Sequence, residues 1–483
     1  MSTPIDTFSP AHAMLAALQA RQISAVELLD MHLARIAAHN PALNAIVTHH
    51  EAQARAQARQ VDAALAAGQS PDRLWALTGL PITIKDNIPV AGLPTTNGLR
   101  ERAGNIATRS APSAQRLLDA GAVLLGKTNL STNAGDWQAE NALFGRTNNP
   151  WDPTRTPGGS TGGGGAALAA GMTPLELGTD IGGSIRIPAA FCGVYGHRPS
   201  DGIVPWVWRP NPGRVLNVHG PLARSPLDLE LALGLLAGPE NGEERGWRLD
   251  PAVARHQAIR DFRVAVLPAI GWVPLEEEVG AAQDDLISVL RGQGTEVKVA
   301  QPEGFDPDAH ERLYAALLAA MECEGMDEAK RAAFAAAMRH SPNRFGAAQA
   351  EGATAMAPQY LALLQERERY RHMFREFFRH YDLVLTPMSP VPAFTHIPEG
   401  VPLPERTLAV GGRTMHYEQL SVYPGIATVS GLPATAFPWG VTRAGLPIGM
   451  QVVGPYLEDR TPLRFAQLLE RQYGGFTPPP RLA

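Results

Sequence analysis

Two serines lie in glycine-rich segments and have the surroundings that acyl transfer requires. Ser160 is within residues 157–163 (PGGSTGG), and Ser184 is within residues 178–189 (GTDIGGSIRIPA). Glycines let the backbone approach a ligand closely, and main-chain amides converging on an oxyanion usually contribute most to acyl-transfer catalysis. The candidate oxyanion donors are the successive amides of Ile181, Gly182, Gly183 and Ser184. Asp180 and Arg186 flank this turn, and we expect them to pair and brace it.

Lys85 is the third residue whose type and position point to chemistry. The chain has 42 Lys+Arg, but the lysines among them are only Lys85, Lys127, Lys298 and Lys330. Arginine keeps its proton in proteins, whereas a desolvated lysine becomes a neutral amine that acts as a base. Lys85 follows the apolar run at residues 80–84, where burial disfavours the charged form. We therefore predict that Lys85 is a catalytic base rather than a surface charge.

Two other short motifs compete with this interpretation. Residues 121–128 (GAVLLGKT) match the spacing of a phosphate-binding P-loop, but residues 122–125 predict a strand, whose amides would be used in a sheet. Residues 158–162 (GGSTG) match the nucleophile elbow of α/β-hydrolases. That elbow needs a buried strand directly before the serine, and the prolines within residues 150–157 exclude a central strand there. The sequence therefore favours a serine enzyme of another kind.

Three segments in this order resemble the amidase signature family: residues 85–87 (KDN), 158–163 (GGSTGG) and 180–186 (DIGGSIR). Further agreement comes from residues 127–129, 191–196, 219–225 and 445–451. The resemblance spans most of residues 70–230 and returns near the C-terminus. It implies an α/β fold, namely a single large domain with a central mixed β-sheet covered by helices on both faces.

The resemblance also implies a role for each triad residue, without a cofactor or a metal ion. Ser184 would be the nucleophile, Ser160 the bridging serine held by a cis peptide after Gly159, and Lys85 the neutral base. The chain departs from the family at two places. Thr161 replaces the second serine of the loop, which puts the hydrogen bonds around the triad in question. His197-Arg198-Pro199 stands where a Lys-Pro pair is usual, which concerns local packing.

The remaining sequence predicts the elements that position these residues. Ser24 and Glu27 have the spacing of a capping box, which opens a helix that Asn40-Pro41 should end. A second helix is expected from about His50 to Gly68. Apolar runs predict buried strands at residues 80–84, 122–125, 383–386 and 450–453. The Gly/Pro-rich residues 150–165 predict a loop that leads into a helix at residues 166–170.

We expect one domain over residues 1–483. Its predicted parts are a helical layer (residues 1–70), a catalytic core (71–240), a peripheral helical insertion (305–380) and a return to the core sheet (381–483). The composition, with 45% hydrophobic and 18% charged residues, is typical of a globular protein. Cys192 and Cys323 are too few and too far apart for a disulfide framework, so we expect buried free thiols.

Charge and hydropathy exclude several classes of partner. A net charge of -5 provides no basic field for nucleic acid or for an anionic membrane surface. The N-terminal residues lack the pattern of a secretory signal, and no stretch has eighteen uninterrupted apolar residues. We expect a cytoplasmic monomer or homodimer that acts on a small molecule.

The candidate substrate contacts are Asp136, Trp137, Trp206, Trp208 and Tyr417. These residues supply aromatic and polar groups that could line an acyl or amine pocket. We expect a hydrolase of neutral, fairly hydrophobic amides that also accepts aryl amides, esters and carbamates, because all of these form the same kind of tetrahedral intermediate. Two alternatives remain open. One is the A subunit of a glutamyl-tRNA amidotransferase, acting as a glutaminase with a partner, against which the Trp-rich residues 205–208 argue. The other is an inactive binding protein, against which the complete triad argues.

Overall fold

The computed structural model describes residues 4–68, 76–205, 215–240, 242–398 and 400–482, and within them the chain is built on a mixed sheet of eleven strands. Across the sheet the strands are β1 (Ile46–His49), β3 (Val123–Thr128), β2 (Pro81–Lys85), β6 (Leu175–Asp180), β8 (Val218–Ala223), β7 (Tyr195–Arg198), β14 (Ala434–Val441), β15 (Pro447–Val453), β11 (Leu383–Pro387), β9 (Arg263–Val266) and β10 (Glu296–Val299). The β3–β2–β6 and β11–β9–β10 neighbours are parallel, and the other neighbours are antiparallel.

Helices cover both faces of the sheet, as the family resemblance predicts. Successive residues of a strand point to opposite faces, and in β11 Leu383 and Leu385 join one apolar cluster whereas Val384 joins the other. The first cluster includes residues of α1 (Ala11–Gln19), α2 (Ala25–Leu43), α3 (Glu51–Ala66), α4 (Pro112–Asp119), α7 (Pro226–Leu236), α8 (Glu277–Gly292) and α14 (Arg460–Tyr473). The second includes residues of α6 (Arg186–Cys192), α9 (Pro307–Glu322), α12 (Ala357–Phe377) and α13 (Val422–Ser430). The α/β fold with a central mixed sheet is confirmed.

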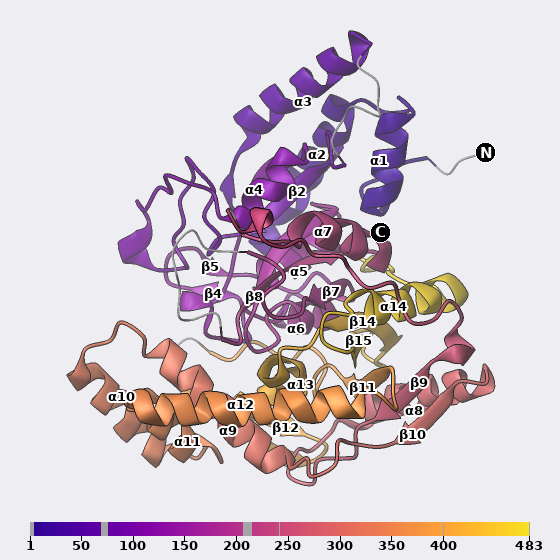
Figure 1. The fold of residues 1–483 in the computed structure, drawn as a ribbon. Helices are drawn as coiled ribbons and strands as arrows, with labels where there is room; N and C mark the ends of the chain where they lie inside the picture. Colours follow the sequence, from indigo (N-terminus) through magenta and orange to yellow (C-terminus); the bar gives the residue numbers. More distant parts are fainter. Residues whose placement is uncertain (1–3, 69–75, 206–214, 241, 399, 483) are drawn as a thin grey trace.

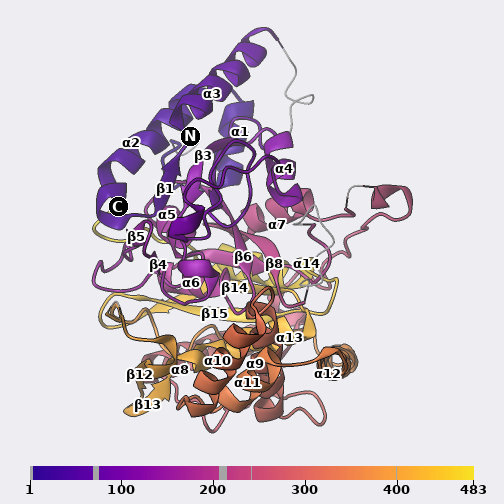
Figure 2. The same ribbon diagram turned by 90° about the vertical axis from the view of Figure 1, so that its left-hand side faces the viewer.

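The N-terminal helices and the helices after residue 305 lie at opposite ends of the molecule. Figure 1 shows α1 to α3 at the top and α9 to α12 at the bottom, with the sheet between them, and Figure 2 shows the same order from the side. Two shorter helices, α10 (Glu328–His340) and α11 (Gly346–Ala353), complete the lower group. Two small hairpins, β4–β5 (Glu140–Asn141, Gly145–Arg146) and β12–β13 (Thr407–Val410, Arg413–His416), lie outside the main sheet. No helix in the described ranges has the length and apolar character needed to cross a membrane.

The predicted start of the helix after residue 24 is confirmed, and its predicted end is wrong. Ser24 Oγ accepts a hydrogen bond from the Glu27 amide at 3.1 Å, and Glu27 Oε2 accepts one from the Ser24 amide at 2.9 Å. The helix then continues through Pro41. Pro41 removes one amide hydrogen bond and crowds the carbonyl four residues earlier, but it lies in the last turn, and Asn40 Oδ1 stabilises the chain beyond it by accepting from the amides of Ala45 and Ile46.

The helix predicted at residues 166–170 begins four residues earlier, because α5 spans Gly162–Ala169. Glycine has a low intrinsic helix propensity, which is why the sequence predicts a loop. The structure explains these glycines by close packing. A Cβ at Gly163 would lie 2.5 Å from the Asn129 amide nitrogen, and one at Gly164 would lie 2.5 Å from the Glu176 side chain. The helix can therefore approach the sheet only without side chains at these positions.

The four predicted strands are all present, as parts of β2, β3, β11 and β15. The P-loop-like residues 121–128 end in β3, and Thr128 pairs with Lys85 of β2 in the parallel ladder. Backbone amides that belong to a sheet are not available to bind phosphates, so the exclusion of a P-loop is confirmed.

Candidate active site

The side chain of Lys85, the last residue of β2, is fully buried. Its Nζ lies 2.6 Å from Ser160 Oγ and 2.8 Å from Thr179 Oγ1. Burial lowers the pKa of Lys85 to about 7, although the negative charges of Asp180 and Glu176 oppose this shift. Near neutral pH a large fraction of Lys85 is therefore an uncharged amine that can accept a proton from Ser160.

The two glycine-rich serine segments meet beside Lys85. The Gly159–Ser160 peptide bond is cis, as the resemblance predicts. The next amide, that of Thr161, donates to Ser184 O at 3.1 Å and so joins the two segments. Ser160 is fully buried, whereas Ser184 is 6% exposed and lines a pocket. Ser184 is therefore the serine that a molecule in this pocket would meet.

Asp180 and Arg186 form a buried ion pair behind the Ser184 turn, which confirms the predicted pairing. Arg186 Nε and Nη2 donate to the two carboxylate oxygens of Asp180, each at 3.0 Å. The amides of Gly183 and Ile185 donate to the same carboxylate at 3.0 and 3.1 Å. Burial by itself would raise the pKa of Asp180, but the charges of Arg186 and Arg198 and these hydrogen bonds outweigh it and lower the pKa to about 2. Asp180 thus stays ionised.

Arg186 also connects the Ser184 turn to the C-terminal part of the chain. Its Nη1 donates to Pro424 O at 3.1 Å and to Gln451 Oε1 at 2.9 Å, and its Nη2 donates to Thr428 Oγ1 at 3.2 Å. Gln451 ends the 445–451 motif in β15, and the other two acceptors belong to α13. This motif therefore supports the turn from behind.

The main-chain carbonyls of the Ser184 turn are all held by hydrogen bonds. The donors are Tyr314 Oη to Ile181 O (3.4 Å), Trp137 Nε1 to Gly182 O (3.1 Å), the Ile187 amide to Gly183 O (2.7 Å) and the Thr161 amide to Ser184 O (3.1 Å). In a trans peptide the N–H points away from the C=O.

This arrangement leaves three amides of the turn, those of Ile181, Gly182 and Ser184, without an acceptor among the described residues. The Gly182 and Ser184 amides point away from the donors that hold the preceding carbonyls, and neither donates to another described residue. The Gly183 amide already donates to Asp180. The set of available oxyanion donors is therefore smaller than the four that the sequence predicts.

A pocket opens beside Ser184. Its wall includes Trp137, Tyr314, Leu318, Leu403, Glu322 and Glu418. Of the predicted substrate contacts, Asp136 and Trp137 line this pocket. Tyr417 is fully buried and lies behind them, with its hydroxyl donating to Asp136 Oδ1 at 2.6 Å. Trp206 and Trp208 are outside the described residues.

Helix α9 supplies the pocket residues that the sequence does not reveal. Tyr314, Leu318 and Glu322 are spaced four residues apart and share one face of the helix. Low polarity around Glu322 and the charge of Glu418 raise the pKa of Glu322 to about 7, although its side chain reaches the solvent of the pocket. The helical spacing is visible in the sequence, but nothing in it shows that this face meets Ser184.

Both departures from the family pattern are accommodated by packing. The Thr161 hydroxyl donates to Thr179 O at 3.3 Å, and a Cβ at Gly178 would lie 2.8 Å from the Thr161 methyl carbon. The extra methyl therefore fits because residue 178 is glycine. His197 Nδ1 lies 2.9 Å from Thr435 Oγ1, and its Nε2 lies 3.2 Å from Asp459 Oδ1. His197 thus has a structural role.

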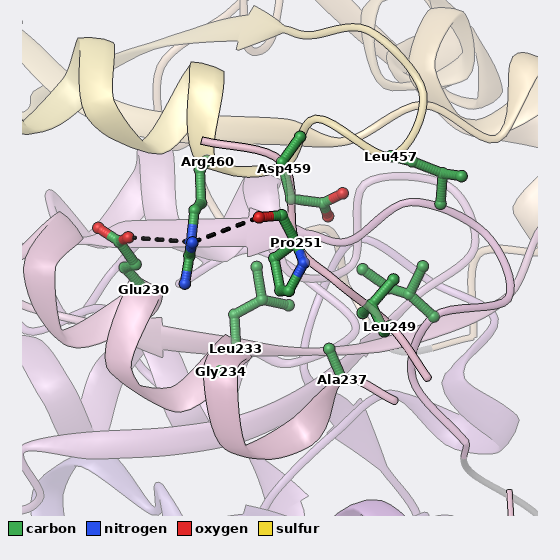
Figure 3. Close-up of a pocket in the computed structure, with 11 residues that line it drawn as sticks. Glu230, Leu233, Gly234, Ala237, Leu249, Pro251, Leu457, Asp459 and Arg460 are labelled. Carbon is green, nitrogen blue, oxygen red and sulfur yellow. Dashed lines mark hydrogen bonds and ion pairs between the residues drawn. The ribbon is translucent and has the colours of Figure 1, made fainter. Parts of the chain in front are cut away.

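A second pocket, shown in Figure 3, lies between α7 and the start of α14. Apolar side chains such as Leu233 and Leu249 line it, beside an ion pair of 3.3 Å between Arg460 Nε and Glu230 Oε1. None of the candidate catalytic residues reaches it. Elsewhere, Cys192 and Cys323 are buried free thiols, as predicted, and the described residues contain no group of His, Cys, Asp and Glu side chains suited to a metal ion.

The sheet, the cis Gly–Ser peptide and the buried lysine beside it define a class of α/β enzymes with paired serines. The family model for amidases matches residues 27–463. The chain belongs to the amidase signature family, whose members are hydrolases that act on C–N bonds.

Relatives of the chain span nearly its whole length. The A subunit of the glutamyl-tRNA(Gln) amidotransferase from Synechococcus sp. (strain CC9605) is 34% identical over 493 residues, which cover 96% of this chain and 96% of that protein. The structure of the peptide amidase from Stenotrophomonas maltophilia is 25% identical, with a TM-score of 0.75 and 98% of each chain covered. A bacterial aryl acylamidase of the same family has a TM-score of 0.81 at 24% identity, covering 97% of this chain and 96% of that chain, and at this identity it shows the fold alone.

Replacing Lys85 tests whether its amine is the base. We expect Lys85→Ala to lower kcat/KM at least about 100-fold, because general-base catalysis contributes roughly that much or more. Lys85→Arg should fail as well, since arginine cannot accept the proton. Circular dichroism and the melting temperature check the fold of both variants. A folded Lys85→Ala protein with normal activity would show that the lysine is not the base.

The pH dependence should follow the protonation of Lys85. Its pKa is lowered to about 7, and only the neutral amine is a base, so kcat/KM should rise with pH through about 7 and fall below it. Glu322 also has a pKa of about 7. The matched variant Glu322→Gln removes that titration, and it should keep the rising limb. Loss of the limb in this variant would assign it to Glu322.

Proposed function

We propose that this protein is a free-standing serine hydrolase that cleaves the C–N bond of neutral, fairly hydrophobic amides through an acyl-enzyme. The observation that carries the proposal is the pocket at Ser184, whose wall includes Trp137, Tyr314 and Leu318. Apolar and aromatic walls with a few polar groups are typical of small-molecule sites. Aryl amides, esters and carbamates pass through the same kind of tetrahedral intermediate, so we include them in the proposed substrate range.

In the proposed acylation step, Ser184 Oγ attacks the carbonyl carbon of the amide. Its proton passes to Ser160 Oγ as the Ser160 proton passes to Lys85 Nζ, which lies 2.6 Å away. The carbonyl oxygen becomes an oxyanion, which the amides of Gly182 and Ser184 stabilise. Lys85 then returns the proton through Ser160 to the leaving nitrogen. The C–N bond breaks, the amine leaves, and the acyl group stays on Ser184.

Water completes the proposed cycle by the same route. A water molecule attacks the acyl-enzyme, and its proton passes through Ser160 to the neutral Lys85. The second tetrahedral intermediate uses the same two amides. Its collapse releases the carboxylic acid, and the proton on Lys85 returns to Ser184. Lys85 therefore begins and ends as an amine, which fits a pKa of about 7.

A second candidate function is the glutaminase component of a glutamyl-tRNA amidotransferase, because a relative with that name is 34% identical. Glutamine carries an α-carboxylate. A site that binds this carboxylate needs a cationic side chain or several hydrogen-bond donors. The ionisable side chains that line the pocket are those of Asp136, Glu322 and Glu418, and Glu322, with a pKa of about 7, is only partly ionised near neutral pH. The nearby Arg406 already pairs with Asp136, at 2.5 Å. This lining disfavours an anionic substrate group and supports the neutral-amide proposal.

The third possibility is an inactive protein on the amidase fold. A fully buried lysine has a cost in stability unless its environment is built for it, and here Lys85 Nζ contacts two hydroxyls, those of Ser160 and Thr179. Retention of this buried contact, with an accessible Ser184, supports a working enzyme.

Two p-nitroanilides of similar length test the proposed substrate class. We expect the purified protein alone to hydrolyse butyryl-p-nitroanilide, and to hydrolyse succinyl-p-nitroanilide at least about tenfold less efficiently in kcat/KM. The added carboxylate would face the acidic lining, and about 1.4 kcal/mol of repulsion corresponds to that factor. Release of p-nitroaniline measures both rates. Activity seen only with glutamine and added partner proteins would favour the amidotransferase.

A fluorophosphonate probe tests the assignment of the nucleophile. We expect it to label Ser184, because this hydroxyl lines the pocket while Ser160 is fully buried. Mass spectrometry of the labelled peptide gives the site, and Ser184→Ala is the matched control that should not react. Label on Ser160 would support the nucleophile elbow at residues 158–162 instead.

A further inference from the structure

Residues 136–138 pass between the two glycine-rich segments that carry the serines. On one side, a Cβ built on Gly159 would lie 2.3 Å from Asp136 O and 2.7 Å from the carbonyl carbon of Trp137. On the other side, Trp137 Nε1 donates to Gly182 O at 3.1 Å. A single short segment therefore touches both the bridging-serine loop and the turn that contains the oxyanion donors.

Asp136 has both carboxylate oxygens bound by side chains from a distant part of the chain. Its Oδ1 accepts from Tyr417 Oη at 2.6 Å, and its Oδ2 accepts from Arg406 Nη1 at 2.5 Å. The Tyr417 ring meets the Trp137 indole at an interplanar angle of 66°, with 5.5 Å between ring centroids. The Arg406 guanidinium lies 5.6 Å from the centroid of the Tyr417 ring. These contacts fix the orientation of the indole next to Asp136.

The indole N–H of Trp137 donates to the peptide between Gly182 and Gly183, which is flexible because both residues are glycines. Gly183 has a φ of +95°, which residues with a side chain rarely adopt. The peptide between Gly182 and Gly183 is held at both ends, its C=O by Trp137 and its N–H by Asp180 Oδ1 at 3.0 Å. If the Trp137 bond were absent, this peptide would be free to rotate about the Asp180 contact. Such a rotation would change ψ of Gly182 and φ of Gly183, and with them the relative orientation of the two flanking peptides that carry the Gly182 and Ser184 amides.

We propose that Trp137 is a positioning residue for the oxyanion site, and that Asp136, Tyr417 and Arg406 act through it. This inference rests on the proposed hydrolase function. It differs from a role in substrate contact, because the indole N–H is directed at a main-chain carbonyl. Only the ring of Trp137 is left for contact with a substrate in the pocket. The N–H and the ring therefore have separable roles.

Trp137→Phe removes the N–H and retains an aromatic ring. We expect kcat to fall about 10- to 100-fold with KM changed less than about twofold, because the lost contact supports the transition state and not substrate binding. Trp151→Phe is the matched control, since Trp151 Nε1 also donates to a main-chain carbonyl, that of Cys192, at 2.9 Å. This variant loses the same kind of bond away from the turn and should keep the wild-type kcat.

The rate of Ser184 labelling by a fluorophosphonate gives a second measurement that needs no amide substrate. The phosphoryl oxygen occupies the oxyanion site during that reaction, so we expect labelling of Trp137→Phe to slow by a similar factor. If the wild type is labelled but hydrolyses no amide, the proposed function fails while this comparison still tests Trp137. Unchanged kcat and labelling rate would overturn the inference, as would a raised KM at unchanged kcat.

Tyr417→Phe keeps the inference testable if Trp137→Phe does not fold. This variant keeps the buried ring and removes only the 2.6 Å hydrogen bond to Asp136. Arg406 still holds the carboxylate, so we expect a smaller loss of kcat, about threefold to tenfold, with the same unchanged KM. A folded Tyr417→Phe protein with wild-type kcat and labelling rate would overturn the role of Asp136 in positioning Trp137.

Discussion

The uncharged state of one buried amine governs the arrangement of the site. Lys85 is fully buried at the end of β2, and desolvation favours its uncharged form near neutral pH. A free carboxylate close by would reverse that effect by favouring the ammonium form. Asp180 is a nearby carboxylate whose charge opposes the shift. It is not free, because Arg186 binds both of its oxygens and Arg198 Nε lies 3.9 Å from Oδ1.

The same ion pair gives the Ser184 turn its shape. Asp180 accepts hydrogen bonds from the amides of Gly183 and Ile185. Arg186 donates hydrogen bonds to residues of α13 and β15. The carbonyls of the turn are held from outside, and a Cβ at Gly182 would require Tyr314 Oη, which would lie 2.2 Å away, to shift. One buried pair thus links the charge state of the base to the direction of the amides. The charge state of Lys85 is set by electrostatics and the orientation of the amides by backbone geometry. Both depend on the side chains of Asp180 and Arg186.

Much of the catalytic centre could be predicted from the sequence because its chemistry is local. Lys85 ends an apolar strand, and the cis Gly159–Ser160 peptide and the Asp180–Arg186 pair lie within short motifs. The glycines of α5 indicate a loop by their composition, while the packing against Asn129 and Glu176 requires a helix without side chains. Local propensity could not reveal that constraint, which comes from neighbours far away in the sequence.

The pocket is harder to predict from the sequence because its lining residues come from segments that are far apart in the chain. Tyr314, Leu318 and Glu322 occupy one face of α9, and Leu403 and Glu418 come from a later segment, so only the fold brings them to Ser184. The aromatic ring of Tyr417 suggests a substrate contact, but the residue is fully buried and works through Asp136. Periodicity identifies the face of a helix but not the element that this face meets.

The site motifs are local in sequence, whereas the pocket residues are brought together only by the fold. This difference explains why similarity along the whole chain does not identify the substrate. A 34% identical relative covers 96% of this chain, and a fold and its family do not by themselves specify the substrate. In the proposed function, selectivity depends on the pocket side chains in α9 and in the segment after residue 400. A carboxylate such as Glu418 adds negative charge to the pocket and has no contact with Lys85 among the described hydrogen bonds and ion pairs. One catalytic centre can therefore serve substrates of different charge, and the charge of the pocket wall is stronger evidence for the substrate than overall identity.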